Sequence, residues 1–251
     1  MGDPIQSIRH ASLVVAEGDP APAKPPAKPK GVGQGSAAPT PPPPPVVKDR
    51  MERDKGEIEI KEANKKRQRY ESFPLTPDNT RGILQREYLV VTSRDIQNQL
   101  ATDGAGPCVI MAVWNPDARK AGLAHVDSRT NNVSIRGFMK QVASGARDGT
   151  KIQVHLVGGT RDTIDLQVRL LHEIKNNPAL ELVSADLGGD LENRSLAISA
   201  TTGKIQPVGQ AEIDEGINVE TRSRWVESKN SYLRKVPEQF FKHPEKSKDA
   251  R

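Results

Sequence analysis

The sequence predicts an α+β domain over residues 81–209, with a layered, β-sandwich-like sheet core flanked by helices. Three observations favour this class. Short apolar or β-branched runs recur along this stretch, as expected for strands. Two longer segments carry apolar residues at helical spacing. Strands and helices do not alternate one for one, and the chain has neither a GxGxxG nor a P-loop motif, so nucleotide-binding α/β folds gain little support.

A β-hairpin is predicted at the centre of the domain. Residues 108–114 (CVIMAVW) form a continuous apolar run, which is typical of a strand buried on both faces. Residues 122–126 (GLAHV) can pair with this run across the Asn-Pro-Asp turn at 115–117. The β-branched run at 88–92 (YLVVT) precedes both and predicts an earlier strand.

The second half of the domain supplies two helices and the remaining strands. Residues 133–146 predict a helix with Phe138 and Val142 on its apolar side. Asp162 can cap a second helix, whose apolar stripe consists of Ile164, Val168, Leu171 and Ile174. The further strands are expected at 151–157, ending at Gly158-Gly159, at 180–185, and in a hairpin of 195–200 with 205–208.

Composition divides the chain into three parts. Residues 1–80 hold 14 of the 20 prolines and also a dense mixed-charge run, so we expect this region to be disordered. A helix within 49–71 is the alternative for the charged run, with Gly56 acting against it. The domain at 81–209 follows, and residues 210–251 are expected to form a polar C-terminal extension.

Two segments of the N-terminal region each admit two interpretations. The stretch 20–45 predicts a semi-rigid polyproline linker, or alternatively a ligand for an adaptor domain with an aromatic groove. The basic cluster at 65–69 (KKRQR) is either a solvated charged face or a nuclear-import signal.

Composition also excludes several function classes. A single cysteine cannot form an intramolecular disulfide or a zinc site with two or more thiolates. No run of eighteen apolar residues is present, so no membrane partner is expected. The net charge of +5 is spread along the chain instead of forming a basic patch, which argues against a nucleic-acid partner. With no recognisable secretory signal, the simplest location is cytoplasmic.

The single cysteine, Cys108, is the candidate for chemistry. It opens the central strand after a glycine-rich approach, in which Gly104 and Gly106 let backbone N–H groups come close to a ligand. His125 lies about as far beyond the turn as Cys108 lies before it, so the hairpin can bring the two side chains together. Such a pair is the minimal unit of thiol catalysis, the alternative being a small buried hydrophobe. His155, expected in mid-strand, is a poorer candidate than His125.

Four motifs in order give a resemblance to two related deamidase families. The segment GAGPCVIMAVW followed by GLAH resembles the cysteine–histidine core of the chemoreceptor glutamine deamidase family. The segments REYLVVTS, LAHVD and VHLVGG are similar to motifs of the protein N-terminal asparagine amidohydrolase family. The resemblance covers roughly residues 83–208. Pro107 departs from both families, which usually carry serine or threonine before the nucleophile.

The resemblance implies a set of site residues. Cys108 would attack a side-chain carboxamide, and His125 would accept the thiol proton and return it to the departing ammonia. Thr102 stands at the position of the third active-site residue and would orient the imidazole. Asp127 is the candidate for binding the α-ammonium of an N-terminal substrate residue. This chemistry needs no metal and no organic cofactor.

The predicted function is therefore hydrolysis of a carboxamide of a protein substrate, with release of ammonia, at an N-terminal asparagine. One alternative is a glutamine deamidase that acts on a folded target, such as an effector delivered into a host cell by a specialised secretion system. A further alternative is a non-catalytic binding module with the same fold.

Overall fold

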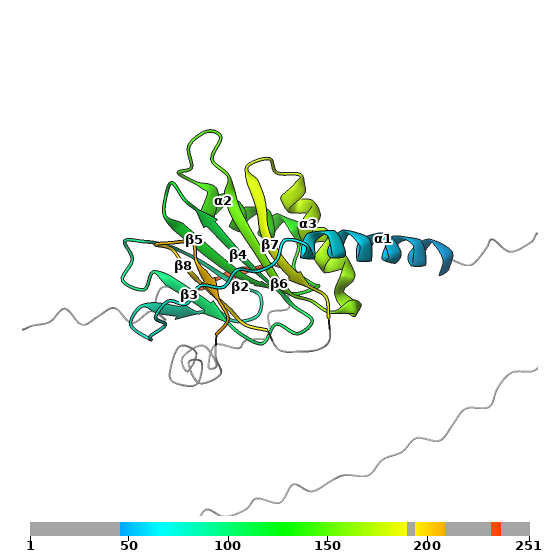
Figure 1. The fold of residues 1–251 in the computed structure, drawn as a ribbon, viewed down its shortest axis with the longest axis horizontal. Coiled ribbons are helices and arrows are strands. Elements are labelled where there is room, and N and C mark those ends of the chain that lie inside the picture. The colour runs from blue at the N-terminus through cyan, green and yellow to red at the C-terminus, as the bar shows by residue number, and fades with distance from the viewer. Residues whose placement is uncertain (1–45, 190–193, 209–231, 237–251) are drawn as a thin grey trace, which may run out of the picture. The chain divides into compact units, whose positions relative to one another are not determined.

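The computed structural model describes residues 46–189, 194–208 and 232–236. Within these ranges the chain forms two β-sheets, of six and four strands, and three α-helices (Figure 1). The predicted α+β class with a layered sheet core is confirmed. The proline-rich stretch 20–45 lies outside the described residues, as does most of the C-terminal extension. None of the described helices is long and apolar enough to cross a membrane.

The larger sheet is mixed and has the strand order β10-β2-β5-β4-β6-β7. The pairs β2–β5, β5–β4 and β4–β6 are antiparallel, whereas β6–β7 and β10–β2 are parallel. The strands are β2 (Glu87–Thr92), β4 (Val109–Asn115), β5 (Lys120–Val126), β6 (Ile152–Gly158), β7 (Leu180–Leu187) and β10 (Arg234–Lys235). The predicted central hairpin is therefore β4–β5.

The smaller sheet has the order β1-β3-β8-β9 and packs on one face of the larger sheet. Its strands are β1 (Thr80–Gly82), β3 (Gln99–Thr102), β8 (Leu196–Ser199) and β9 (Ile205–Gln206). Leu100 of β3 and Ile198 of β8 meet Leu89 of β2 and Ile110 of β4 in a fully buried cluster between the sheets. The expected hairpin near the end of the domain corresponds to β8 and β9.

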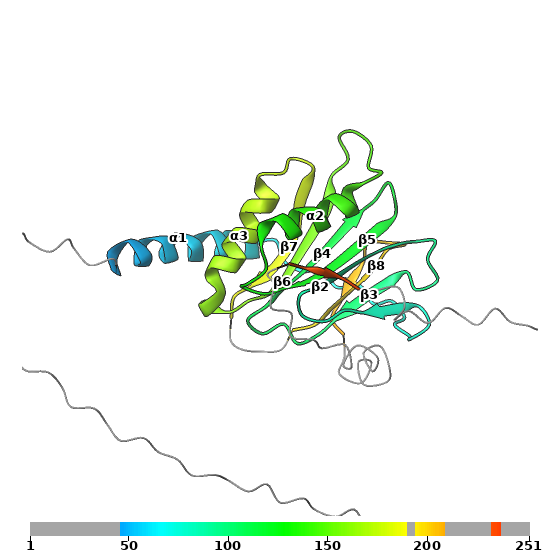
Figure 2. The same cartoon turned by 180° about the vertical axis from the view of Figure 1, so that it is seen from behind.

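Two helices cover the opposite face of the larger sheet, as Figure 2 shows: α2 (Asn132–Ala143) and α3 (Ile164–Lys175). The buried residues of α2 recur at helical spacing, namely Ile135, Phe138, Met139 and Val142. The central strand is apolar throughout because both of its faces are buried. Its Val109, Met111 and Val113 face the helices, and Cys108, which directly precedes it, lies with its Ile110 and Ala112 on the smaller-sheet side.

A third helix, α1 (Val46–Asn64), forms in the charged part of the N-terminal region. Its Ile60 and Ala63 are buried in the core shared with α3 and β7. Asn64 anchors its end, since its Nδ2 donates to the carbonyl of Leu187 (2.7 Å) and its Oδ1 accepts from the N–H of the same residue (2.9 Å). The C-terminal end of α1 thus packs with the domain, although it precedes the boundary expected at residue 81.

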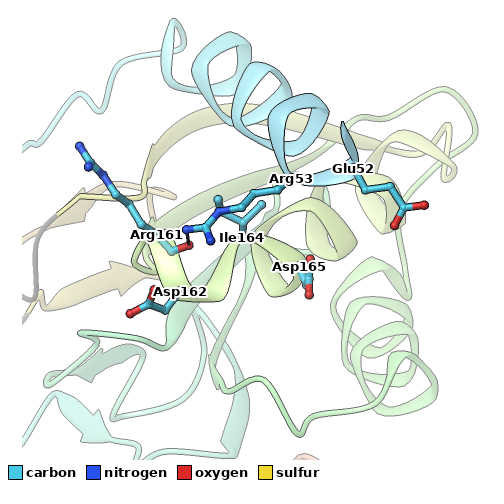
Figure 3. Close-up of a pocket in the computed structure, with 6 residues that line it drawn as sticks. All are labelled: Glu52, Arg53, Arg161, Asp162, Ile164 and Asp165. Atoms are coloured by element: carbon cyan, nitrogen blue, oxygen red, sulfur yellow. Dashed lines mark hydrogen bonds between the residues drawn. The ribbon is translucent and has the colours of Figure 1, made fainter. Parts of the chain in front are cut away.

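Gly56 explains how this charged helix can pack so closely. A Cβ added at residue 56 would lie 2.7 Å from Cγ2 of Ile164 at the start of α3. Arg53, one turn earlier on α1, donates from Nη2 to the carbonyl of Arg161 (3.2 Å; Figure 3). The glycine that lowered the helical propensity of the segment is therefore the residue that permits the contact with α3.

Candidate active site

Cys108 and His125 lie on one face of the sheet at the open end of the β4–β5 hairpin. The register places His125 directly opposite Ile110 and Val126 opposite Val109. Cys108 precedes Val109, so its side chain lies on the same face as those of Ile110 and His125. Cys108 and His125 are therefore diagonal cross-strand neighbours, whose Cα atoms are typically about 7–8 Å apart. Both are buried between the two sheets, with 5 % and 3 % of their surface exposed.

Thr102 holds the imidazole from the other sheet. Its Oγ1 lies 3.0 Å from Nδ1 of His125, and the same hydroxyl donates to the carbonyl of Ile83 (2.9 Å). Because the hydroxyl proton is committed to that carbonyl, Nδ1 must carry the proton in the bond to Thr102. In a neutral imidazole Nε2 is then left as a bare acceptor. It has no hydrogen-bond partner within the described part of the chain, so it is free to accept a proton.

Burial favours the neutral forms of both the Cys108 thiol and the His125 imidazole. It raises the pKa of the Cys108 thiol from 9.0 to about 11, with Asp127 adding to the rise and Arg86 opposing it. Burial also lowers the pKa of His125 from 6.5 to about 4, against the opposing effect of Asp127. A preformed thiolate is therefore not the resting state. If this sulfur is to attack a substrate, its proton would have to pass to a base such as His125, as in general-base catalysis.

The glycine-rich segment 104–106 places backbone groups close to Cys108. Gly104 has φ +75°, and a Cβ there would meet nothing within 4 Å, so this part of the loop borders open space. The N–H groups of Ala105 and Gly106 are already used, since they donate to the carbonyls of Arg194 (3.0 Å) and Gly104 (3.1 Å). The N–H of Cys108 donates to no other described group. It is thus the available donor for an oxyanion beside the thiol.

Two glycines that end β6 support the backbone of Cys108. Gly158 pairs with Val109 and has φ +109°, and the N–H of Gly159 donates to the carbonyl of Cys108 (2.7 Å). A Cβ at Gly158 would lie 2.5 Å from that same carbonyl oxygen. Neither glycine was among the site residues expected from the sequence. The tandem glycine in the VHLVGG motif was the available signal.

Gly158→Ala is expected to impair catalysis by displacing Cys108. A side chain at this φ is strained by about 1–3 kcal/mol, and the Cβ contact would push the carbonyl of Cys108 away. Because misplacement by about 1 Å can cost about 10²-fold in rate, we expect a fall of that order in kcat. Gly137→Ala in α2 is the matched control, since its Cβ would meet nothing within 4 Å. Equal activity of the two folded variants would contradict this role.

Asp127 is built into a turn directly beside the site. Its Oδ1 accepts from the N–H and the hydroxyl of Thr130 (3.0 and 2.9 Å) and from the N–H of Arg129 (3.1 Å). Its Oδ2 lies 3.2 Å from Nε2 of Gln85 and 3.4 Å from Nε of Arg86. Asp127 as a whole residue is only 8 % exposed. One oxygen thus organises the turn, and the other belongs to an ion pair next to Cys108.

The connection between β1 and β2 links these groups, and sequence reasoning missed it. Arg86 has φ +62°, unusual for a non-glycine residue, and its N–H donates to the carbonyl of His125 (2.7 Å). Its own carbonyl accepts from the N–H of Arg234 in β10 (2.8 Å). Glu87, 1 % exposed, then binds Nη2 of Arg234 through Oε1 (2.7 Å). The C-terminal strand therefore braces the residues around His125.

The buried histidines predict a loss of stability in acid. Burial lowers the pKa of His125 and of His155 from 6.5 to about 4. Between pH 6.5 and about pH 4 the unfolded chain binds more protons than the folded one, so the free energy of unfolding falls as the pH falls. Above pH 6.5 each neutral histidine contributes about 3 kcal/mol to the free energy of unfolding, and this contribution is lost by pH 4. Urea unfolding across this window should be less pH-dependent for His155→Gln, and an unchanged dependence would contradict the prediction.

Comparison with known proteins adds one match. A family model described as protein N-terminal asparagine amidohydrolase matches residues 73–242, more than half of the chain. The matched range contains Thr102, Cys108, His125 and Asp127, and also the bracing strand β10. A search of curated proteins finds no match. Among the described residues, no group of three or more His, Cys, Asp or Glu side chains is placed to hold a metal ion.

Proposed function

The chain belongs to the protein N-terminal asparagine amidohydrolase family, and we propose that it deamidates N-terminal asparagine with Cys108 as the nucleophile. The observation that carries this proposal is the state of His125. Thr102 fixes its tautomer, so the unpartnered Nε2 is a proton acceptor on the same face as the thiol. This is the arrangement that a neutral thiol requires if it is to attack without a preformed thiolate.

The first step forms a tetrahedral intermediate. Sγ of Cys108 attacks the carboxamide carbon of the asparagine side chain while the thiol proton passes to Nε2 of His125. The carbonyl oxygen becomes an oxyanion, and the N–H of Cys108 donates to it. One such donor typically contributes about 3–4 kcal/mol to the transition state. Pro107 has no N–H to add a second donor from the preceding residue.

The remaining steps release ammonia and regenerate the thiol. His125 returns its proton to the amide nitrogen, the C–N bond breaks, and a thioester with Cys108 remains. Water then attacks the thioester carbon and gives its proton to Nε2 of His125. The C–S bond breaks, the sulfur takes the proton back, and aspartate leaves. The net reaction consumes one water and converts the carboxamide to a carboxylate and ammonia.

Recognition of a free N-terminus requires an anion close to the thiol. Asp127 is our candidate because its charge acts directly on Cys108 and because its Oδ2 faces away from the turn. A substrate ammonium bound to Oδ2 of Asp127 would replace the hydrogen bond from Gln85, while the ion pair with Arg86 would keep the carboxylate oriented. The charge of Asp127 thus selects a free α-ammonium beside a neutral carboxamide.

A peptide panel tests the proposed function. Ammonia release is measured from peptides that begin with Asn, N-acetyl-Asn or Gln, from a peptide with internal Asn, and from folded proteins with exposed Gln. Release from free N-terminal Asn alone supports the proposal. Release only from Gln in a folded protein would replace it with the glutamine deamidase alternative. No release from any substrate would favour the non-catalytic module.

Asp127→Asn is expected to weaken the preference for a free N-terminus. Asparagine keeps Oδ1 as an acceptor for the turn but removes the charge. A charge-assisted bond is worth about 1.5–3 kcal/mol, so the ratio of kcat/KM for free and N-acetylated Asn peptides should fall about 10–100-fold. The loss should appear mainly in KM for the free peptide. An unchanged ratio in the folded variant would assign Asp127 to the turn alone.

A further inference from the structure

The C-terminal strand β10 is seated in the domain, although the sequence assigned it to a polar extension. It pairs in parallel with β2, as Figure 2 shows for the short red strand, and the N–H of Val236 donates to the carbonyl of Tyr88 (3.1 Å). The residues on either side of β10 are apolar and buried. Leu233 joins the core beneath the helices, and Val236 joins the core between the two sheets. The strand therefore lies firmly beside the turn that leads into β2.

Arg234 of β10 neutralises a buried carboxylate at the start of β2. Glu87 is 1 % exposed, and Nη2 of Arg234 donates to its Oε1 (2.7 Å). Oε2 of Glu87 accepts from the N–H of Leu84 (3.0 Å), and the N–H of Glu87 donates to the carbonyl of Leu84 (2.9 Å). Glu87 thus closes the turn of residues 84–87, and Arg234 supplies the cation that lets this carboxylate stay charged in a buried position.

The turn of residues 84–87 carries a group that lies beside the active site. Arg86 has φ +62°, a conformation that a non-glycine residue keeps only where its surroundings enforce it. Two backbone bonds hold it there, since its N–H donates to the carbonyl of His125 (2.7 Å) and its carbonyl accepts from the N–H of Arg234 (2.8 Å). Nε of Arg86 lies 3.4 Å from Oδ2 of Asp127. The strand β10 therefore fixes the backbone of the residue that forms the ion pair with Asp127.

We propose that Arg234 is a positioning residue for substrate recognition, a role that rests on the proposed deamidation of N-terminal asparagine. Through Glu87 and the backbone of Arg86, it holds the Asp127 carboxylate where the α-ammonium of the substrate binds. The reacting thiol and imidazole do not depend on this route, because the β4–β5 pairing and Thr102 hold them. Loss of the Arg234 side chain should therefore weaken substrate binding more than it slows the chemistry.

Steady-state kinetics of full-length Arg234→Gln on a free N-terminal Asn peptide test this role. The variant leaves the buried carboxylate without its cation, and water offsets part of that loss because the Arg234 side chain is 41 % exposed. We expect KM to rise about 10-fold and kcat to stay within about 2-fold of the wild-type value. Lys235→Gln is the matched control, because it removes the same charge from the exposed neighbour on β10 and should change neither constant. An unchanged KM in Arg234→Gln, a loss confined to kcat, or equal effects of the two variants would overturn the proposal.

A double variant tests whether the effect passes through Glu87. Glu87→Gln/Arg234→Gln removes both charges, so no carboxylate remains buried without a cation. Its KM should return to within about 3-fold of the wild-type value, because the two positions act as a coupled pair. A double variant as impaired as Arg234→Gln would exclude the route through Glu87 and overturn the proposal.

Hydrogen exchange separates this proposal from the proposed function, because it needs no substrate. The N–H groups of Leu84 and Arg86 are both hydrogen-bonded in the turn, so both should exchange at least about 10-fold faster in Arg234→Gln than in Lys235→Gln. Exchange of the amides of β4 and β6 should be equal in the two variants. If the wild type releases no ammonia from any Asn peptide, the deamidation proposal fails and the exchange rates alone decide the role of Arg234. Faster exchange at residues 84 and 86 then supports it, and equal exchange overturns it.

Discussion

Cys108→Ala should reduce ammonia release from an N-terminal asparagine peptide to the uncatalysed background. The variant removes the only atom in the site that can form the thioester, and loss of a nucleophile commonly costs about 10⁴-fold or more in kcat. His125 and the N–H of Cys108 remain in place, so substrate binding should persist. The measurement is the rate of ammonia production, together with the mass change of the peptide from Asn to Asp.

Two controls make this result interpretable. Cys108 is small and packs among apolar side chains, so its replacement by alanine should change the free energy of unfolding by only about 1 kcal/mol. Urea unfolding of the variant verifies this. Cys108→Ser keeps the shape and a hydroxyl, yet should also be nearly inactive because the serine hydroxyl is a much weaker nucleophile here. Substantial deamidation by a folded Cys108→Ala protein would remove the thiol from the mechanism.

His125→Gln is expected to lower kcat by about 10²–10⁴-fold, the usual contribution of general acid–base catalysis. The glutamine amide can still donate to Oγ1 of Thr102, so the link between the two sheets is kept. It has no basic atom to accept the thiol proton, which the high pKa of Cys108 makes essential. The wild-type enzyme should lose activity in acid as His125 becomes protonated, and the residual activity of the variant should instead rise as the thiol ionises at high pH.

His155→Gln is a closely matched control for this variant. His155 is buried to a similar extent, its Nδ1 also binds a hydroxyl, its Nε2 is also unpartnered, and burial also lowers its pKa to about 4. It differs in binding Ser184 of β7 instead of lying beside Cys108. We expect its kcat to stay close to that of the wild type. Equal losses in the two variants would indicate a structural effect of removing a buried imidazole, and would contradict the role of His125 as the base.

The sequence predicted the features that depend on local pattern. The continuous apolar run before the Asn-Pro-Asp turn and the GLAHV run after it predicted the β4–β5 hairpin, and the structure contains it. A hairpin is set by alternation and turn chemistry within some twenty residues, so the approach of Cys108 and His125 could be expected from spacing alone. The apolar side of α2 was visible for the same reason. On α3 the expected Ile164 and Ile174 are buried, whereas Leu166 and Leu170 are buried in place of Val168 and Leu171, which are only partly buried.

Other features were missed because they depend on distant partners. The strands β1, β3 and β10 are short and partly polar, and they are held by pairing with strands far away in the chain. The charged segment that forms helix α1 was left open between disorder and a helix within 49–71, with Gly56 acting against the helix. Only the approach permitted by Gly56 lets Ile60 and Ala63 become buried.

By itself the sequence determined the fold class and the central hairpin, because these follow from short-range periodicity, and it singled out Cys108 and His125 as the candidate pair. The tertiary structure alone decided how that pair is tuned. Packing the two sheets together buries Cys108 and raises its pKa, and it brings Thr102 to Nδ1 of His125, which leaves Nε2 as the acceptor atom of the neutral imidazole. It also leaves Nε2 of His155 without a hydrogen-bond partner among the described residues. Burial and hydrogen bonding across long sequence separations set protonation states, and neither can be obtained from the local pattern of residues.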